Sequence, residues 1–171
     1  MNYRFLLERQ EILDRHIIER HELQDQFLLE DKILALKVEL GELANETRCF
    51  KFWSKKPASK KGVILEEFVD VIHFLLSISF DVKERLAFPN STISPVLVSE
   101  SKTDQFNEVY AAIERFGKLA FCSAVSLENE YTDIWSLYLG LGKMLGFTEE
   151  EIEEYYMYKN KVNHYRQEIG Y

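Results

Sequence analysis

The sequence is poor in residues that interrupt helices, because its 171 residues include only seven glycines and three prolines. Long segments therefore continue without a break, which predicts helices and disfavours a fold built from many tight turns. Cysteine is scarce too. Cys49 and Cys122 lie far apart in apolar or aromatic surroundings, and we expect both to be buried free thiols in a reducing compartment.

Long hydrophobic runs are also lacking. No segment reaches the ~20 apolar residues of a membrane-spanning helix, and the charged start MNYRFLLERQEIL does not resemble a signal peptide. Positive charge is in deficit, with 21 Lys and Arg against 29 Asp and Glu and a net charge of −8. This balance argues against binding to a nucleic-acid backbone, although a divalent cation can still bridge acidic side chains to a nucleotide. We expect a cytoplasmic protein with no membrane or nucleic-acid partner.

What the chain does contain is enough apolar residues for a core: 46% of its residues are hydrophobic and 13% aromatic. The length suits one domain, residues 1–171. Apolar residues recur at helical spacing over about 3–21, 28–52 and 63–80. Between the last two segments, residues 54–62 form a basic loop with a proline and a glycine as breakers. The fold class predicted is all-α, a helical bundle.

The second half of the chain is less uniform. Residues 81–104 carry two prolines and many Ser and Thr, which predicts a loop insertion, and the apolar residues 96–98 suggest a short strand within it. Helical spacing resumes afterwards in two segments. The final helix begins at Thr148, where Glu151 completes a capping box, and Gly170 is its predicted end.

An acidic patch interrupts the second predicted helix in the stretch ELGELANE. At about 100° per residue, Glu39, Glu42 and Glu46 fall within about 60° of one another. No Lys or Arg lies one turn away, and Glu42 and Glu46 form an unfavourable like-charge pair. The ordinary interpretation is a solvated helix edge. The alternative is that these carboxylates await a cation from elsewhere.

A second acidic patch, EEFVD, lies on the third predicted helix. Glu67 and Asp70 share a face of a helix that is otherwise strongly apolar, where uncompensated acids are costly. A short loop could make the two helices antiparallel and bring these acids to Glu39 and Glu42. Four carboxylates form the all-oxygen site that Mg²⁺ or Mn²⁺ prefers. A zinc site is disfavoured, because the four histidines show no ligand spacing.

A third polar group lies near the C-terminus, in KNKVNHYRQEIGY. Lys159, Asn163 and Arg166 fall within about 60° on one helical face, with Asn160 alongside. Such a group is often a solvated last turn with cations at the negative end of the helix dipole. Alternatively, its cations neutralise phosphate oxygens while its amides contact a sugar or a base.

Four stretches in this order resemble one family: RQEILD, ELGELANETRCFKFWS, EEFVDVIHFLLS and YKNKVNHYRQEIGY. They are similar to the dimeric dUTPases of Gram-positive bacteria and their phages. Those enzymes belong to the all-α nucleoside triphosphate pyrophosphatases, which include MazG-like proteins. Only about 81–130 is weakly matched. The resemblance implies that type of bundle, a homodimer, and hydrolysis of dUTP to dUMP and pyrophosphate by attack of a metal-activated water at the β-phosphorus.

The resemblance also implies roles for particular residues. Two or more Mg²⁺ ions, which Mn²⁺ could replace, would be held by Glu39, Glu42, Glu67 and Asp70. One of the first two glutamates would orient or deprotonate the attacking water. Many relatives carry Asn where this chain has Asp14. The residues implied in binding dUTP are Gln10, Asp14, Trp53, His73, Phe74, Lys159, Asn163 and Arg166, with Tyr171 closing the site.

Two other functions remain open from the sequence. One is a related pyrophosphatase of other or broad base specificity, which the acids alone would serve equally well. The other is a metal-free helical interaction module, for which four uncompensated carboxylates would have no use. We also expect a homodimer from the residues themselves, because the apolar third helix and the aromatic stretch 106–147 offer more hydrophobic surface than one small bundle needs.

Overall fold

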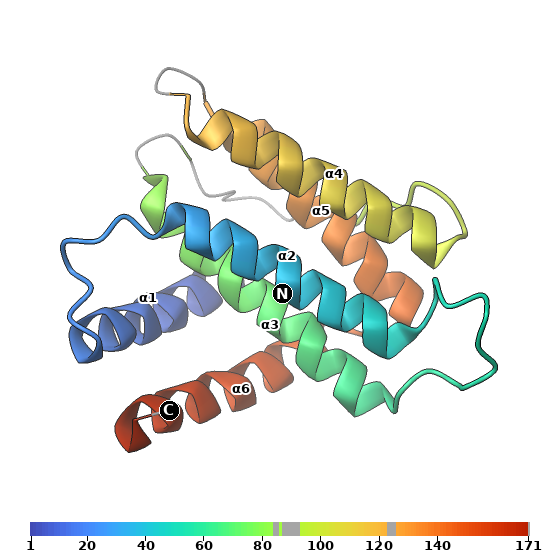
Figure 1. Ribbon diagram of the computed structural model, residues 1–171, viewed down its shortest axis with the longest axis horizontal. Helices are drawn as coiled ribbons and strands as arrows, with labels where there is room; N and C mark the ends of the chain where they lie inside the picture. Colours follow the sequence, from blue (N-terminus) through green and yellow to red (C-terminus); the bar gives the residue numbers. More distant parts are fainter. Residues whose placement is uncertain (84–85, 87–92, 123–125, 171) are drawn as a thin grey trace.

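The computed structural model describes residues 1–83, 86, 93–122 and 126–170. These residues form six helices and no strand, which confirms the predicted all-α fold (Figure 1). The helices are α1 Tyr3–Arg20, α2 Leu29–Thr47, α3 Lys61–Asp81, α4 Lys102–Ala120, α5 Glu128–Leu145 and α6 Glu149–Ile169.

The helices are arranged as three adjacent pairs (Figure 1). Antiparallel α4 and α5 lie on one side, antiparallel α2 and α3 in the middle, and α1 and α6 on the other side. Helix α3 is central, since it contacts α1, α2 and α6. Helix α5 also covers it: the hydroxyl groups of Tyr131 and Tyr138 each donate a 2.8 Å hydrogen bond, to the carbonyl oxygens of Leu75 and Phe68 respectively.

The central position of α3 explains its apolar sequence. Its side chains are buried along almost the whole helix, from Ile64 to Ser79. Most of the aromatic residues on α4 and α5, among them Phe116, Tyr131 and Trp135, are buried as well. The apolar surface on which the sequence-based expectation of a homodimer rested is therefore used within the chain. Any interface would use the apolar side chains that remain exposed.

Helix α2 ends earlier than the predicted range 28–52. Its last residue is Thr47, and Arg48 takes a left-handed conformation with φ of 58°. The Arg48 side chain then donates hydrogen bonds to the carbonyl of Lys56 and the hydroxyl of Ser54. These contacts fold the following loop back on the helix end. A single residue at positive φ is not visible in a hydrophobic pattern, which is why the prediction continued the helix.

The other helix ends lie closer to expectation. Helix α3 begins at Lys61, so the predicted breaker Gly62 is inside its first turn, where glycine is readily tolerated. The capping box at the start of α6 is confirmed, with reciprocal hydrogen bonds between Thr148 and Glu151. Gly170 ends the same helix at a φ of 74°, a conformation that glycine adopts without a steric penalty.

The short strand predicted at 96–98 does not form. The Val96 amide donates a 2.8 Å hydrogen bond to the carbonyl of Ser136 on α5, and its carbonyl accepts one from the Gln105 side chain. This backbone therefore pairs with a helix and a side chain, not with a second strand. The approach is close enough that a Cβ added to Gly140 would lie 1.9 Å from the Val96 oxygen, so only glycine fits there.

The predicted insertion at 81–104 is only partly described. Helix α3 extends into it as far as Asp81, and α4 already starts at Lys102. Residues 84–85 and 87–92 lie outside the described part of the chain.

The expectations for the two cysteines and for membrane-spanning helices can be compared with the fold. Cys49 and Cys122 are both free, as predicted, but only Cys49 is partly buried, and the expectation that Cys122 is buried is wrong because it lies exposed just beyond the end of α4. Among the described residues, no helix is long and apolar enough to cross a membrane.

Candidate active site

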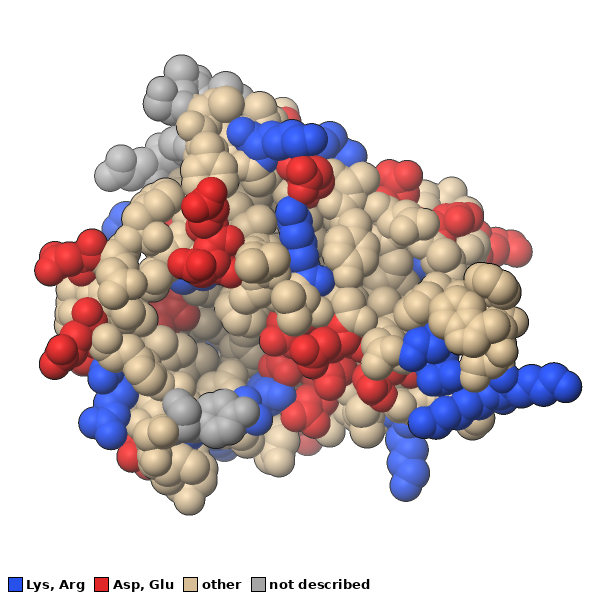
Figure 2. Space-filling view, in the orientation of Figure 1, with Lys and Arg blue, Asp and Glu red and all other residues tan. Residues whose placement is uncertain are grey.

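The acidic residues of α2 and α3 meet where the two helices run side by side. One carboxylate oxygen from each of Glu39, Glu67 and Asp70 lies within 4.8 Å of the others. The i,i+3 spacing on α3 turns Glu67 and Asp70 to the same side, facing α2. Acidic side chains gather there on the molecular surface, beside a hollow (Figure 2). We call these three residues the acidic cluster.

Burial and mutual repulsion raise the pKa values of the acidic cluster. Desolvation comes first and the charges of Asp70 and Glu42 second, and together they raise the pKa of Glu39 and of Glu67 to about 7. Burial also raises the pKa of Asp70. The carboxylates therefore lack enough positive charge within the chain. A divalent cation would supply it, and an all-oxygen set suits a hard cation such as Mg²⁺.

Lys159 on α6 supplies part of the missing charge. Its ammonium group donates hydrogen bonds of 2.6 Å to Asp70 and 2.8 Å to Glu66, and only 5% of the residue is exposed. Burial alone would lower the pKa of Lys159, but these two hydrogen bonds outweigh that effect and raise it. The sequence predicted Lys159 as a phosphate contact, whereas here its charge is committed to carboxylates of α3.

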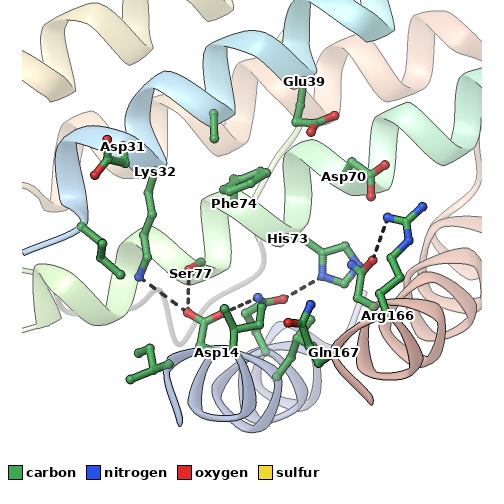
Figure 3. Close-up of a pocket in the computed structure, with 17 residues that line it drawn as sticks. Asp14, Asp31, Lys32, Glu39, Asp70, His73, Phe74, Ser77, Arg166 and Gln167 are labelled. Atoms are coloured by element: carbon green, nitrogen blue, oxygen red, sulfur yellow. Dashed lines mark hydrogen bonds and ion pairs between the residues drawn. The ribbon is translucent and has the colours of Figure 1, made fainter. Parts of the chain in front are cut away.

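A cavity of about 420 Å³ lies next to the acidic cluster, enclosed by α1, α2, α3 and α6. Glu39 and Asp70 belong to its wall, so cavity and cluster are continuous (Figure 3). Its size is within the range of small-ligand sites. The lining residues are Gln10, Leu13, Asp14, Ile17, Ile18, Leu28, Asp31, Lys32, Ala35, Glu39, Asp70, His73, Phe74, Ser77, Asn163, Arg166 and Gln167.

A buried polar network crosses this cavity wall (Figure 3). Asp14 accepts hydrogen bonds from the Gln10 amide at 2.6 Å and from the Ser77 hydroxyl at 2.5 Å. Because an ionised carboxylate only accepts, Gln10 must turn its NH₂ group toward Asp14. The Gln10 oxygen then accepts from Tyr156 at 2.7 Å and from His73 Nδ1 at 2.8 Å. Each hydrogen bond of this network therefore has one fixed donor and one fixed acceptor.

This assignment of donors and acceptors determines which ring nitrogen of His73 carries the proton. With its proton on Nδ1, the ring carries an unprotonated Nε2, a buried atom without a hydrogen-bond partner among the described residues. Burial, reinforced by the Lys159 charge, lowers the pKa of His73 to about 3 and keeps the ring neutral. One ring face stacks on Tyr156. His73 is thus held neutral in the cavity wall, with a buried acceptor nitrogen.

Phe74, Asn163 and Arg166 complete the predicted residues that the structure brings to the cavity. Phe74 projects into it from α3 (Figure 3), and aliphatic side chains of α1 and α2 form much of the remaining wall. Arg166 donates a long 3.4 Å hydrogen bond to the Asn163 amide oxygen one turn earlier on α6. The cavity therefore combines an apolar interior with cationic and amide groups near the acids.

Other predicted residues lie elsewhere. Trp53 is 65% exposed on the loop after α2, where it packs edge-on against Phe50 and Phe52 instead of lining the cavity. Glu42 is exposed beside the acidic cluster but is not one of its three members. Tyr171 lies outside the described residues.

Glu46, the third acid of the first patch, has a different role. Its carboxylate accepts a hydrogen bond from the Ser59 hydroxyl, and its backbone carbonyl accepts one of 3.0 Å from the Ser59 amide. Glu46 therefore anchors the loop between α2 and α3. It is not part of the acidic cluster.

The sequence did not identify four polar residues of the cavity wall: Asp31, Lys32, Ser77 and Gln167. Ser77 and Gln167 lie within two of the stretches that resemble the family, and the other available signal was spacing. Lys32 precedes Glu39 by seven residues on α2, and Ser77 follows Asp70 by seven on α3, which is two helical turns and the same face. Lys32 belongs to no recognisable motif, and Ser77 ends the family stretch EEFVDVIHFLLS without an assigned role, so spacing alone could not have selected them.

The sequence matches a known protein family. The family model described as dUTPase matches residues 2–171, nearly the whole chain. No curated protein matches the sequence.

Proposed function

As a member of the dUTPase family, the chain is a dUTP diphosphatase, and we propose that the acidic cluster and the adjoining cavity form its active site. The observation that carries this proposal is their continuity. Glu39 and Asp70 belong both to the acidic cluster and to the wall of the cavity. A nucleotide could therefore have its phosphates at the acids and its nucleoside in the apolar interior.

dUTPases generally depend on a divalent metal, and the acidic cluster is a group that could hold one. We propose Mg²⁺, with two or more ions per site and Mn²⁺ as a substitute. Glu39, Glu67 and Asp70 would be ligands, joined by Glu42 from one turn along α2. Bound Mg²⁺ would neutralise charge on the triphosphate and lower the pKa of a bound water. The raised pKa values of Glu39 and Glu67 support this assignment.

The protein's own groups supply the rest of the chemistry. Glu39 or Glu42 orients the attacking water and accepts its proton, since both flank the site of reaction. Lys159 is a positioning residue, because its hydrogen bonds fix Asp70 and Glu66. Arg166 and Asn163 bind the phosphates and the sugar. These groups neutralise charge and hold the substrate, which is what phosphoryl transfer requires most.

The nucleoside would occupy the remainder of the cavity. Phe74 packs against the base, and His73, also in the cavity wall, holds the Gln10 oxygen through its Nδ1 hydrogen bond. Gln10 contacts uracil at the cost of part of its present hydrogen bonding, and Asp14 acts through Gln10 because its oxygens already accept from two other groups. Trp53 has no role in this arrangement, since it lies outside the cavity.

We further propose that the protein is a homodimer. The interface would use apolar side chains that one chain leaves in solvent, such as Leu34 and Val38, which are 62% and 50% exposed one turn apart on α2. Phe27 and Phe121, packed edge-on against each other and both exposed, offer more such surface. Light scattering should then give twice the chain mass of 20.2 kDa. A species of the chain mass at micromolar concentration would overturn the homodimer.

The test of the proposed active site is pyrophosphate release from dUTP by the purified protein, with Mg²⁺ or with a chelator. We expect rapid release with Mg²⁺, recovery of part of that rate with Mn²⁺, and a loss of at least about 100-fold in the chelator. Equal rates with and without metal would overturn the assignment of the acidic cluster. Absence of dUTP hydrolysis under every condition would overturn the proposed function itself.

A further inference from the structure

We propose that Lys32 is a specificity-determining residue, whose ammonium group donates a hydrogen bond to the 4-carbonyl oxygen of the pyrimidine base and rejects the 4-amino group of cytosine. This inference rests on the proposed function, because it requires the nucleotide to lie with its phosphates at the acidic cluster. No short motif surrounds Lys32 in the sequence, and its position became apparent only in the folded chain.

The position of Lys32 fits the far end of a nucleoside. It lies on the same face of α2 as Glu39, seven residues earlier, so the two are about 10 Å apart along the helix axis. On α3, Ser77 is separated from Asp70 by the same two turns and faces the same end of the cavity. When the phosphates bind at Glu39 and Asp70, the group that reaches Lys32 is the base edge most distant from the sugar.

The surrounding charges exclude a phosphate at this end. Lys32 lies 2.7 Å from Asp81 and 3.7 Å from Asp14, and Asp31 also lines the cavity here. Two carboxylates therefore lie beside one ammonium group, and together with Asp31 the acids at this end outnumber the cation, so their combined charge would repel an anion. A neutral carbonyl oxygen meets no such repulsion. The cavity end is suited to a base.

Lys32 retains hydrogen-bonding capacity for a ligand. An ammonium group has three donors. Asp81 takes one of them at 2.7 Å, but the 3.7 Å to Asp14 is too long for a hydrogen bond. The side chain is only 14% exposed and extends along the cavity toward Asp14 (Figure 3), so a group within the cavity can meet a remaining N–H with little competition from water.

The chemistry of Lys32 predicts which bases are accepted. Uracil and thymine both carry a carbonyl oxygen at position 4, which accepts from the ammonium group. Cytosine carries an amino group there, so two donors would face each other in a largely buried place, and neither would be satisfied. Lys32 should therefore separate dUTP from dCTP. It should not separate dUTP from dTTP, which differs only by a methyl group.

The experiment compares kcat/KM for dUTP, dCTP and dTTP in the wild-type enzyme and in Lys32→Met, with Mg²⁺ present. We expect the dUTP to dCTP ratio to fall at least about tenfold, because the buried donor is lost. The dUTP to dTTP ratio should stay within about twofold. Lys32→Arg should restore much of the dUTP to dCTP ratio, because the guanidinium group still only donates.

A structural role gives a different result. If Lys32 only ties α1, α2 and α3 together through Asp14 and Asp81, Lys32→Met lowers the rate with all three nucleotides and leaves their ratios unchanged, which overturns the proposal. Asp81→Asn is the matched control, since it weakens the same ion pair from outside the cavity wall. It should lower the melting temperature and keep the dUTP to dCTP ratio.

A second variant covers the case in which Lys32→Met does not fold. Should Lys32→Met fail to fold, Lys32→Gln replaces it, because its amide can still bond to Asp81 but can present an oxygen to cytosine. The same loss of discrimination is expected, and an unchanged ratio overturns the role of Lys32. A wild-type enzyme that prefers dUTP while the variants keep that preference refutes this inference alone. A wild-type enzyme that does not hydrolyse dUTP refutes the proposed function.

Discussion

The two ends of the cavity are built in different ways. At the acid end, Glu39, Glu67 and Asp70 come from two short motifs on neighbouring antiparallel helices, and their charges repel. At the base end, Asp14 and Lys32 come from different helices, and both are held within a network of hydrogen bonds and ion pairs. The carboxylates of the acid end thus lack enough positive charge to balance them, whereas the polar groups of the base end are held by hydrogen bonds and ion pairs.

This difference indicates what each end does. Repelling carboxylates favour whatever cation neutralises them, so the acid end binds charge and can act on any nucleoside triphosphate. A network of fixed donors and acceptors favours one pattern of complementary groups, so the base end selects among nucleotides. Changes at the acid end should therefore affect the rate with every nucleotide. Changes at the base end should affect the choice between them.

The largest effect is expected from Glu67→Gln, which removes one charge from the acidic cluster at nearly constant shape. Turnover of dUTP should fall at least about 100-fold, because a ligand that neutralises phosphate through the metal is lost. The matched control is Glu46→Gln, since Glu46 anchors the loop after α2 and lies outside the cluster. Near-normal activity of Glu67→Gln with an intact helical spectrum would contradict the acid end as described.

A smaller and different effect is expected from Gln10→Ala at the base end. Preference for dUTP over dCTP should fall about tenfold, because Asp14 and His73 lose the residue between them. The stabilisation of the protein by Mg²⁺ should be unchanged, since the acidic cluster is intact. A loss of Mg²⁺ stabilisation in Gln10→Ala would show that the two ends are not independent.

Phe74→Ala should alter binding more than turnover. The ring projects into the cavity, and its loss removes apolar contact with the nucleoside in both the ground state and the transition state. We expect KM for dUTP to rise several-fold and kcat to change little. Steady-state kinetics at saturating Mg²⁺ separates the two constants. A fall in kcat with constant KM would assign Phe74 to the chemical step instead.

The smallest effect is a shift of thermal stability with pH in metal-free protein. The pKa of Glu39 and of Glu67 rises from an ordinary 4.5 to about 7 on folding. Between these values the folded state holds more protons than the unfolded state, so their contribution to stability is lost as pH rises from about 4.5 to 7. Added Mg²⁺ binds the ionised carboxylates and should abolish this loss.

Melting temperatures measured from pH 5 to pH 8, with chelator and with Mg²⁺, test this expectation. The double variant Glu39→Gln, Glu67→Gln is the control, because it lacks both titrating groups and should lose the chelator-specific fall. If the melting temperature of the metal-free wild type changes with pH in the same way as that of the double variant, burial and repulsion do not raise the pKa values of the acidic cluster as described.

The contrast between the two ends also accounts for what could be predicted from sequence. The acid end was predictable because Glu67 and Asp70 are three residues apart, and helical geometry turns such pairs to one side. Neighbouring helices then brought Glu39 to them. The prediction gave Lys159 to the substrate and did not include its hydrogen bond to Asp70, which it reaches from α6, far along the chain. Sequence spacing carries no information on such a contact.

The base end was accessible only in part. Gln10, Asp14 and His73 entered the prediction through resemblance to a family, not through any pattern of their own. Lys32 was missed because it looks like an ordinary helix residue, and Ser77, at the end of the stretch EEFVDVIHFLLS, was given no role. Only the packing of three helices brings both to Asp14. Trp53 was predicted near the base but is exposed, since α2 ends at Thr47 and the loop carries it outward.

The helices of the fold were more predictable than the two ends of the cavity. Apolar periodicity identified the first five helices, because burial on one face is what such a pattern reflects, and the capping box at Thr148 identified the sixth. The predicted strand at 96–98 failed for a tertiary reason. Its backbone hydrogen bonds are taken by Ser136 and Gln105, and an apolar triplet alone does not reveal the absence of a partner strand.

The central claim is that one cavity joins a metal-binding acid end to a base-selecting end. The most direct measurement is kcat/KM of the wild-type enzyme for dUTP and dCTP, each with Mg²⁺ and with a chelator. The account predicts that dUTP is preferred by at least about 100-fold and that both activities disappear without metal. Ratios near one, or activity that survives the chelator, would contradict it.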